Sequence, residues 1–204
     1  MAKNSEVVLL GSGLRGEKLP PLFFDRITQR DLVVIKKQVK NRKFDASLVL
    51  GVAKRCAWGM PAVIVCRPMK ALEPFPTSFW LTCPYMVKAC DKLESVGGVR
   101  QLEEYLKGNS QKWKAFIVAH ALVRMALLDE SQKNFLISRK RRMWDLMRKG
   151  GPGGIMPKDK VTVKCLHLQV ASWAALGWHP GELWFKTSLP AFKCPVYKER
   201  PCFY

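Results

Sequence analysis

Short apolar runs separated by turn-forming residues mark the strands that the sequence predicts. Residues 46–52 and 61–66 are rich in β-branched side chains, and they flank a short loop at residues 56–59. This pattern predicts two antiparallel strands that are joined across the loop. Residues 6–10 contain two valines and residues 78–81 contain two aromatic residues, so each predicts a further short extended segment.

Apolar positions at helical spacing mark the predicted helices. Residues 25–41 predict a helix whose start signals are Thr28 and Asp31. Three more helical stretches follow, at residues 84–106 with Gly97-Gly98 as a point of interruption, at residues 110–149, which are long enough for two helices, and at residues 161–176, which end at Gly177. Strands come first and helices after, without βαβ alternation. The order predicts an α+β single domain, with a small antiparallel sheet packed against three or more helices.

Glycine and proline outline the expected domain organisation. Residues 1–24 predict a flexible leader that contains glycine and proline, residues 25–177 the single domain, and residues 178–204 an irregular C-terminal tail. Gly11 to Gly16 spells G-x-G-x-x-G after a short strand, which is the fingerprint of a dinucleotide site only where a helix opens next. Pro20 and Pro21 stand there instead. The sequence therefore predicts no dinucleotide cofactor.

Composition narrows the class of protein. The chain has 204 residues, of which 48% are hydrophobic, so it has enough apolar surface for a core of its own. No apolar run approaches the roughly 18 residues of a membrane span, and the stretch from Val7 to Leu10 is shorter than the roughly 7 residues of a secretory signal core. We therefore expect a cytoplasmic protein with no membrane partner. In that compartment its seven cysteines are expected to stay reduced.

Three cysteines stand in local contexts that can present a thiol. Cys56 lies in the predicted loop, Cys83 opens a predicted helix just before Pro84, and Cys165 precedes a histidine. The start of a helix favours negative charge, and the thiolate is the form that binds metal or attacks a substrate. We expect Cys56, Cys83 and Cys165 to converge as ligands of an iron–sulfur cluster or of zinc, with iron–sulfur preferred.

The alternatives to that metal site are a reactive thiol and purely structural cysteines. No C-x-x-C pair is present, so the pattern is less specific than that of a zinc ribbon. Of the other cysteines, Cys90 and Cys194 are expected to be reserve ligands. Cys66 is expected to be a core residue, and Cys202 is expected to have no role in the site.

Two histidines are candidates for catalysis, His120 and His167. His167 stands two residues after Cys165, and in a helix that spacing turns the two side chains to opposite faces. They reach one ion only where the chain is extended or just entering the helix. We expect Cys165 to face inward and His167 to act on a substrate or to support the ligands; the alternative for either histidine is a structural role.

The charge suggests a second function. The chain has 35 Lys and Arg against 16 Asp and Glu, a formal charge of +19, which attracts polyanions. A run of cations suited to a phosphate backbone comprises Arg139, Lys140, Arg141, Arg142, Arg148 and Lys149. Nucleic acid or another polyanion is therefore a possible partner, with the cysteines then serving only the core. The alternative is an exposed helix face anchored by Trp144.

Several sequence blocks together resemble a known family. They are Cys56-x-x-Gly-x-Pro61, Pro74-Phe-Pro-Thr77 leading into Trp80-Leu-Thr-Cys-Pro84, Leu93-Glu-Ser-Val-Gly-Gly98, Gly154-Ile-Met-Pro157, and Val163-Lys-Cys-Leu-His167. Over residues 31–177 the chain resembles the bacterial proteins grouped as domain of unknown function 501. The resemblance implies a bacterial cytoplasmic protein without an assigned activity. It also marks Cys56, Cys83, Cys165 and His167 as positions of the family motifs.

Overall fold

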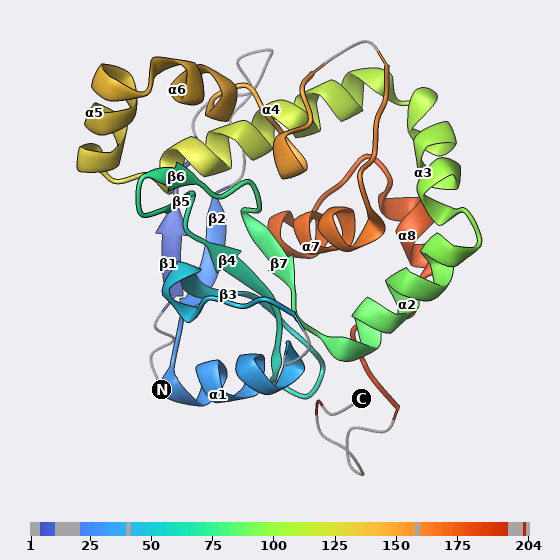
Figure 1. Ribbon diagram of the computed structural model, residues 1–204. Helices are drawn as coiled ribbons and strands as arrows, with labels where there is room; N and C mark the ends of the chain where they lie inside the picture. The colour runs from blue at the N-terminus through green and yellow to red at the C-terminus, as the bar shows by residue number, and fades with distance from the viewer. Residues whose placement is uncertain (1–4, 11–20, 40–41, 158–159, 196–201, 203–204) are drawn as a thin grey trace.

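Five antiparallel strands form one sheet in the order β1-β2-β3-β4-β7 (Figure 1). The computed structural model describes residues 5–10, 21–39, 42–157, 160–195 and 202. The strands are β1 Ser5–Val8, β2 Leu22–Arg26, β3 Val49–Arg55, β4 Pro61–Cys66 and β7 Phe79–Leu81, and a separate two-stranded ribbon comprises β5 Met69–Lys70 and β6 Glu73–Pro74. Helices pack against this antiparallel sheet, which confirms the predicted α+β class.

The predicted hairpin around Cys56 is present as β3 and β4. The two strands pair antiparallel, and the N–H of Cys56 donates to the carbonyl oxygen of Met60 at 2.9 Å to close the loop. Gly59 adopts φ +76°, a conformation that glycine reaches without strain. The first strand begins at Val49 rather than at residue 46, because Asp45 caps a 3-10 turn over Ala46–Leu48.

Strand β4 lies between two apolar layers, and all of its residues are buried. Val63 and Val65 belong to the main core, whereas Ile64 and Cys66 pack with Ile35 of helix α1 Gln29–Gln38. A strand that is buried on both faces needs apolar residues at every position, which is why its sequence does not alternate. Helix α1 begins after Thr28, which forms a capping box with Asp31, and is shorter than predicted because residues 25 and 26 belong to β2.

The remaining helices are α2 Pro84–Ser95, α3 Gly98–Lys107, α4 Ser110–Ala126, α5 Glu130–Arg139, α6 Arg141–Met147, α7 Leu166–Leu176 and α8 Glu182–Ser188. Gly97 separates α2 from α3 at φ +84°, as predicted. Residues 110–149 form three helices rather than two. Asp129 and Gln132 form a capping box that starts α5, and the backbone departs from helical geometry at Lys140 between α5 and α6.

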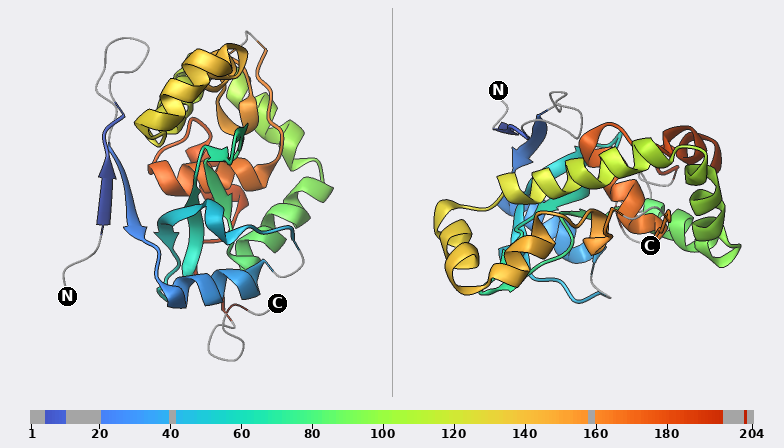
Figure 2. Two further views of the ribbon diagram at one scale, coloured as in Figure 1. Left: turned by 60° about the vertical axis from the view of Figure 1, so that its left-hand side comes forward. Right: turned by 90° about the horizontal axis from the view of Figure 1, so that it is seen from above.

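Helix α7 is central to the helical part. It packs against β7 and also contacts β2, β3 and β4, and its residues Leu166, Val170 and Ala171 are buried in the main core. Figure 1 and Figure 2 show α2 and α3 at one end of α4, and the α5–α6 pair at the other. Among the described residues, no helix is long and apolar enough to cross a membrane.

Both ends of the chain contain regular structure where the sequence predicts a leader and a tail. Strand β1 pairs with β2 through Glu6 and Phe24, and Leu22 is buried. Helix α8 buries Phe185, whose ring stacks on Trp173. Burial of these apolar side chains stabilises both segments against the domain. The glycine-rich stretch of the predicted leader, residues 11–20, lies outside the described residues.

Candidate functional site

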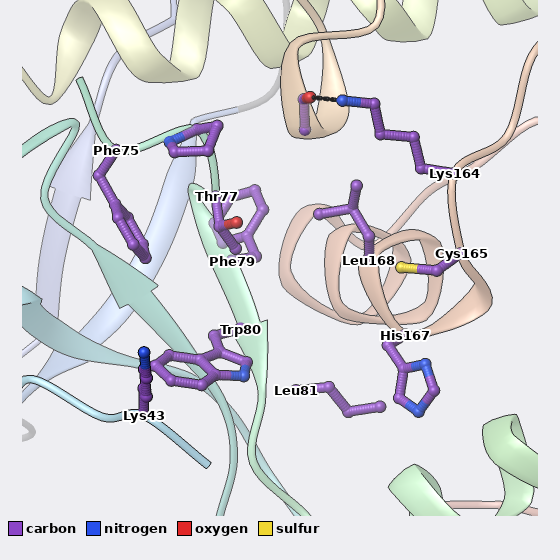
Figure 3. A pocket seen from close by; sticks show the side chains of 12 residues that line it. Lys43, Phe75, Thr77, Phe79, Trp80, Leu81, Lys164, Cys165, His167 and Leu168 are labelled. Atoms are coloured by element: carbon purple, nitrogen blue, oxygen red, sulfur yellow. Dashed lines mark hydrogen bonds between the residues drawn. The ribbon is translucent and has the colours of Figure 1, made fainter.

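A cavity of about 490 Å³ opens between the segment around β7 and the start of α7. Phe75, Phe79 and Trp80 are among its apolar lining residues, and of these Phe79 is fully buried (Figure 3). Cys165 and His167 line the α7 side. Two sequence blocks that carry the family resemblance therefore meet at this cavity, although they are separated in the chain by the whole helical region.

Cys165 and His167 are brought together because the helix starts later than the sequence predicts. Residues 161–165 are not helical, and Cys165 is the extended N-cap residue of α7, with φ −159° and ψ 157°. The N–H of Val163 donates to Glu103 at 2.8 Å, and the N–H of Leu166 donates to Glu94. These carboxylates from α3 and α2 accept the N–H groups of the segment that leads into α7. The side chains of Cys165, an extended N-cap residue, and of His167, the second residue of the helix, can therefore point to the same side. Two ligands of one metal ion need this arrangement.

Glu94, Cys165 and His167 form one compact group. Each offers one ligand atom, and these atoms all lie within 4.8 Å of one another. The Nδ1 atom of His167 lies 3.2 Å from Oε1 of Glu94, and its Nε2 atom lies 3.1 Å from Oδ1 of Asp91. Among the described residues, this is the group of three histidine, cysteine or acidic side chains whose ligand atoms lie close enough together to hold one metal ion.

The surroundings of His167 favour its protonated form. Burial lowers its pKa, but a hydrogen bond with Cys165 and the negative charges of Glu94 and Asp91 outweigh burial, so the pKa of His167 lies above its ordinary value. A raised pKa means that His167 stabilises the folded protein at low pH, and that this contribution is lost as pH rises through the folded-state pKa. The same negative surroundings would attract a cation in place of the proton.

A family model described as "Protein of unknown function (DUF501)" matches residues 52–183. The chain belongs to this family. No curated protein and no solved structure matches the chain. The DUF501 match includes Glu94, Cys165 and His167 as well as the aromatic wall of the cavity, so the whole ligand group belongs to the family region.

Cys56 and Cys83 also lie within the DUF501 match. They are not members of the Glu94–Cys165–His167 group. Cys83 is the N-cap residue of α2, as predicted, and it is buried. Burial raises the pKa of Cys83 to about 11, the neighbouring thiols of Cys56 and Cys202 add to this rise, and the N–H groups of the first helical turn do not outweigh it. Burial therefore opposes the thiolate form expected at this helix start.

The other cysteines have structural surroundings. Cys66 is buried in β4, as expected for a core thiol, and burial raises its pKa to about 12. Cys90 is buried in α2 and burial raises its pKa as well. Cys194 follows the DUF501 match, and its carbonyl oxygen accepts a hydrogen bond from the indole N–H of Trp58 at 3.1 Å. Cys202 accepts a hydrogen bond from Gln38 at 3.5 Å.

His120 is a core residue of the DUF501 region and is not among the described residues that line the cavity. It is fully buried in α4, its Nε2 atom lies 2.8 Å from the hydroxyl of Ser172, and its ring packs edge-on against Phe79. Burial lowers the pKa of His120 well below its ordinary value, so the ring is neutral. Of the two histidines that the sequence offers for catalysis, the structure brings only His167 to the cavity.

The sequence contains little signal for Glu94, Asp91 and the two lysines that line the cavity, Lys43 and Lys164. Glu94 stands in the Leu93–Gly98 block that carries the DUF501 resemblance, which is the one signal that pointed to it. Acidic residues on an amphipathic helix usually form its exposed face, so the helical pattern alone does not select them. Lys43 precedes the DUF501 match.

Proposed function

We propose that Glu94, Cys165 and His167 bind a zinc ion at the edge of the cavity, and that the ion acts on a molecule held there. The compact arrangement of these three ligand atoms carries the proposal. Carboxylate, thiolate and imidazole are all ordinary zinc ligands. Three protein ligands leave a fourth position for water or substrate, which is the arrangement of catalytic rather than structural zinc sites.

The ligand set favours zinc over the iron–sulfur cluster that the sequence suggested. An iron–sulfur cluster is held mainly by cysteine thiolates, whereas this group contains one cysteine. Zinc accepts a mixed set of nitrogen, sulfur and oxygen ligands. The alternative of a reactive thiol uses the same Cys165 and His167 pair, and it differs in needing no metal.

Asp91 would support the metal site from outside. Its carboxylate lies 3.1 Å from Nε2 of His167, while Nδ1 is on the Glu94 side. A carboxylate that accepts a hydrogen bond from the second nitrogen of a histidine ligand fixes the orientation of the ring and makes it a stronger ligand. In this role Asp91 orients His167 and does not touch the ion.

Removing the thiol of Cys165 is expected to weaken zinc binding by about 100-fold or more, because losing a direct ligand should cost at least as much as the largest losses seen when supporting residues of metal sites are changed. The experiment is isothermal titration calorimetry of chelator-treated protein at pH 7.5, with wild type, Cys165→Ser, His167→Gln and Cys83→Ser. Cys56→Ser is the matched control, because it removes a thiol outside the group. Wild type is expected to bind one zinc per chain and the control to bind as wild type does.

Two outcomes would contradict this proposal. A wild-type protein that binds no zinc above the background of the titration would remove the metal and leave the reactive thiol. Equal losses in Cys56→Ser, Cys83→Ser and Cys165→Ser would instead restore the three-cysteine site that the sequence suggested. The circular dichroism spectrum of each variant establishes that it is folded.

We also propose a second function, nucleic-acid binding through the basic hairpin, defined as α5, α6 and the residues that follow α6 up to Lys149. All six cations that the sequence analysis selected are exposed on it, and they accompany one acidic residue, Asp145, between Arg139 and Lys149. Asp145 pairs with Arg148 at 2.9 Å and with Arg141 at 3.7 Å. The hairpin therefore keeps a strong positive charge on a face that is open to solvent, which supports this candidate.

Reversing Arg141 and Arg142 to glutamate is expected to weaken binding of a 20-base-pair DNA duplex and to reduce its salt dependence. The slope of log affinity against log salt should fall by about 2, one for each lost phosphate contact. Fluorescence anisotropy between low and moderate salt measures it. The control is Arg100→Glu with Lys112→Glu, which changes the charge equally on α3 and α4. Equal effects of the two double variants, or no duplex binding by wild type at low salt, would contradict a role of the hairpin.

A further inference from the structure

The charged side chains that line the cavity beside the proposed zinc site are positive. Lys43 and Lys164 line it, and no aspartate or glutamate does so among the described residues. The amine of Lys164 is held by the carbonyl oxygen of Gly153 at 2.6 Å, a neutral partner that leaves its positive charge in place (Figure 3). Arg42 is not among the lining residues; its guanidinium lies 5.4 Å from the ring centre of Trp80 and donates to the carbonyl oxygen of Leu81. The cavity therefore attracts anions.

The wall between these cations is aromatic and apolar. Phe75 and Trp80 are partly exposed there, whereas Phe79, Leu81 and Leu168, which also line the cavity, are buried. The ring of Trp80 packs at a tilt against the ring of Phe44, with the two ring centres 5.6 Å apart. A ring that is fixed in this way offers a surface on which a flat ligand can stack. The volume, about 490 Å³, lies within the range of small-molecule sites.

We infer that the cavity binds a small molecule that combines an aromatic ring with an anionic group, either phosphate or carboxylate. The ring stacks on the aromatic wall, and the anionic group lies toward the lysines. This inference names the class of molecule that would reach the fourth position of the zinc ion, and any reaction of that molecule depends on the proposed function. Binding itself needs only the cavity and its cations.

Four ligands test the class of molecule on chelator-treated protein. Adenosine 5′-monophosphate combines a ring with a phosphate, and 2-naphthoate combines a ring with a carboxylate. Adenosine has the ring without the charge, and inorganic phosphate has the charge without the ring. By calorimetry, at least one of the two aromatic anions is expected to bind 10-fold or more tightly than either of the single-feature ligands. Which of the two binds more tightly distinguishes a phosphate from a carboxylate.

Two variants test the location. Lys43→Glu with Lys164→Glu is expected to weaken binding of the preferred ligand by about 10-fold or more, because two attractive charges become repulsive. Lys112→Glu with Arg100→Glu is the matched control on α3 and α4 and should bind as wild type does. Trp80→Leu should also weaken binding by removing the stacking surface. Thermal unfolding of each variant establishes that it is folded.

The outcomes separate this inference from the zinc proposal. Failure of both aromatic anions to bind more tightly than adenosine and phosphate overturns the inference, even if zinc binds. Equal losses in the cavity variant and the control also overturn it, because the charge effect would then be general. An aromatic anion that binds to chelator-treated protein through Lys43 and Lys164 supports the inference, even if the protein proves unable to bind zinc.

Discussion

Replacing Arg124 with methionine is expected to lower the free energy of unfolding by about 4 kcal/mol, since several buried carbonyl groups lose their partner at about 1–3 kcal/mol each. Arg124 lies in α4 with 3% of its surface exposed. Its guanidinium donates to the carbonyl oxygens of Met147 at 3.0 Å, Gly151 at 2.9 Å and Pro76 at 3.4 Å, and also to Gly150. It thereby joins the end of α6 and the glycine-rich turn to α4.

Arg124 remains charged in this role. Burial lowers its pKa to about 10, which still leaves it protonated at neutral pH. In the described part of the chain its hydrogen-bond partners are carbonyl groups, so the charge is stabilised by backbone dipoles. Urea denaturation followed by circular dichroism measures the effect. Arg124→Lys keeps the charge but forms fewer of these bonds, so its stability should lie between those of wild type and Arg124→Met. A loss below about 1 kcal/mol in the methionine variant would contradict this account.

Replacing Gly51 with alanine is expected to cost about 3 kcal/mol of stability, at the upper end of what overpacking a core usually costs. Gly51 lies in β3, opposite Arg26 of β2 and Val65 of β4. A methyl group there would overlap the backbone carbonyl oxygen of Asp25 and the ring of Phe24. The backbone oxygen cannot move away without disturbing the pairing of β2 with β3.

Gly108→Ala makes the same substitution where there is room, and it is the control for Gly51. A Cβ atom at Gly108 would lie 3.8 Å from the nearest backbone oxygen, and its φ of −66° suits alanine. We expect the control to be neutral or more stable by up to about 1 kcal/mol. Urea denaturation compares both variants with wild type. An equally stable Gly51→Ala protein would mean that β2 is free to move away from β3.

The elements that the sequence predicts correctly are those whose boundaries are set by residues close to them in the chain. Thr28 and Asp31 form the capping box that starts α1, and Gly97 ends α2 through its positive φ. The run of apolar residues in β4 reflects burial on both faces. In each case the pattern, the turn chemistry and the structure agree, which is the condition under which local reasoning succeeds.

Helix α7 begins later than the sequence predicts, because the contact that keeps residues 161–165 outside the helix comes from another part of the chain. Apolar residues such as Val161 and Val163 fit a helical pattern, but Glu103 accepts the N–H of Val163. That contact depends on how α3 packs against the segment. Tertiary contacts of this kind override local preference, and a single sequence does not show them.

The candidate site was predicted in part for the same reason. Cys165 and His167 stand together in the sequence, so their partnership was visible. Cys83 was selected from its place at a helix start, but burial, which the sequence does not reveal, raises its pKa to about 11. Glu94 was overlooked because its partners are more than 70 positions away, as its contact with His167 shows.

The contact between Glu94 and the start of α7 also bears on the order in which the protein assembles. Helices α3 to α6 lie between Glu94 and Cys165 in the chain. Bringing the two residues together closes a long loop at a cost in entropy, so we expect their contact to form late in folding. A partly folded chain in which α7 has not docked would hold neither the cluster nor the cavity wall that α7 supplies. Any ligand of this site would therefore recognise the fully docked protein, and its binding would draw the folding equilibrium toward completion.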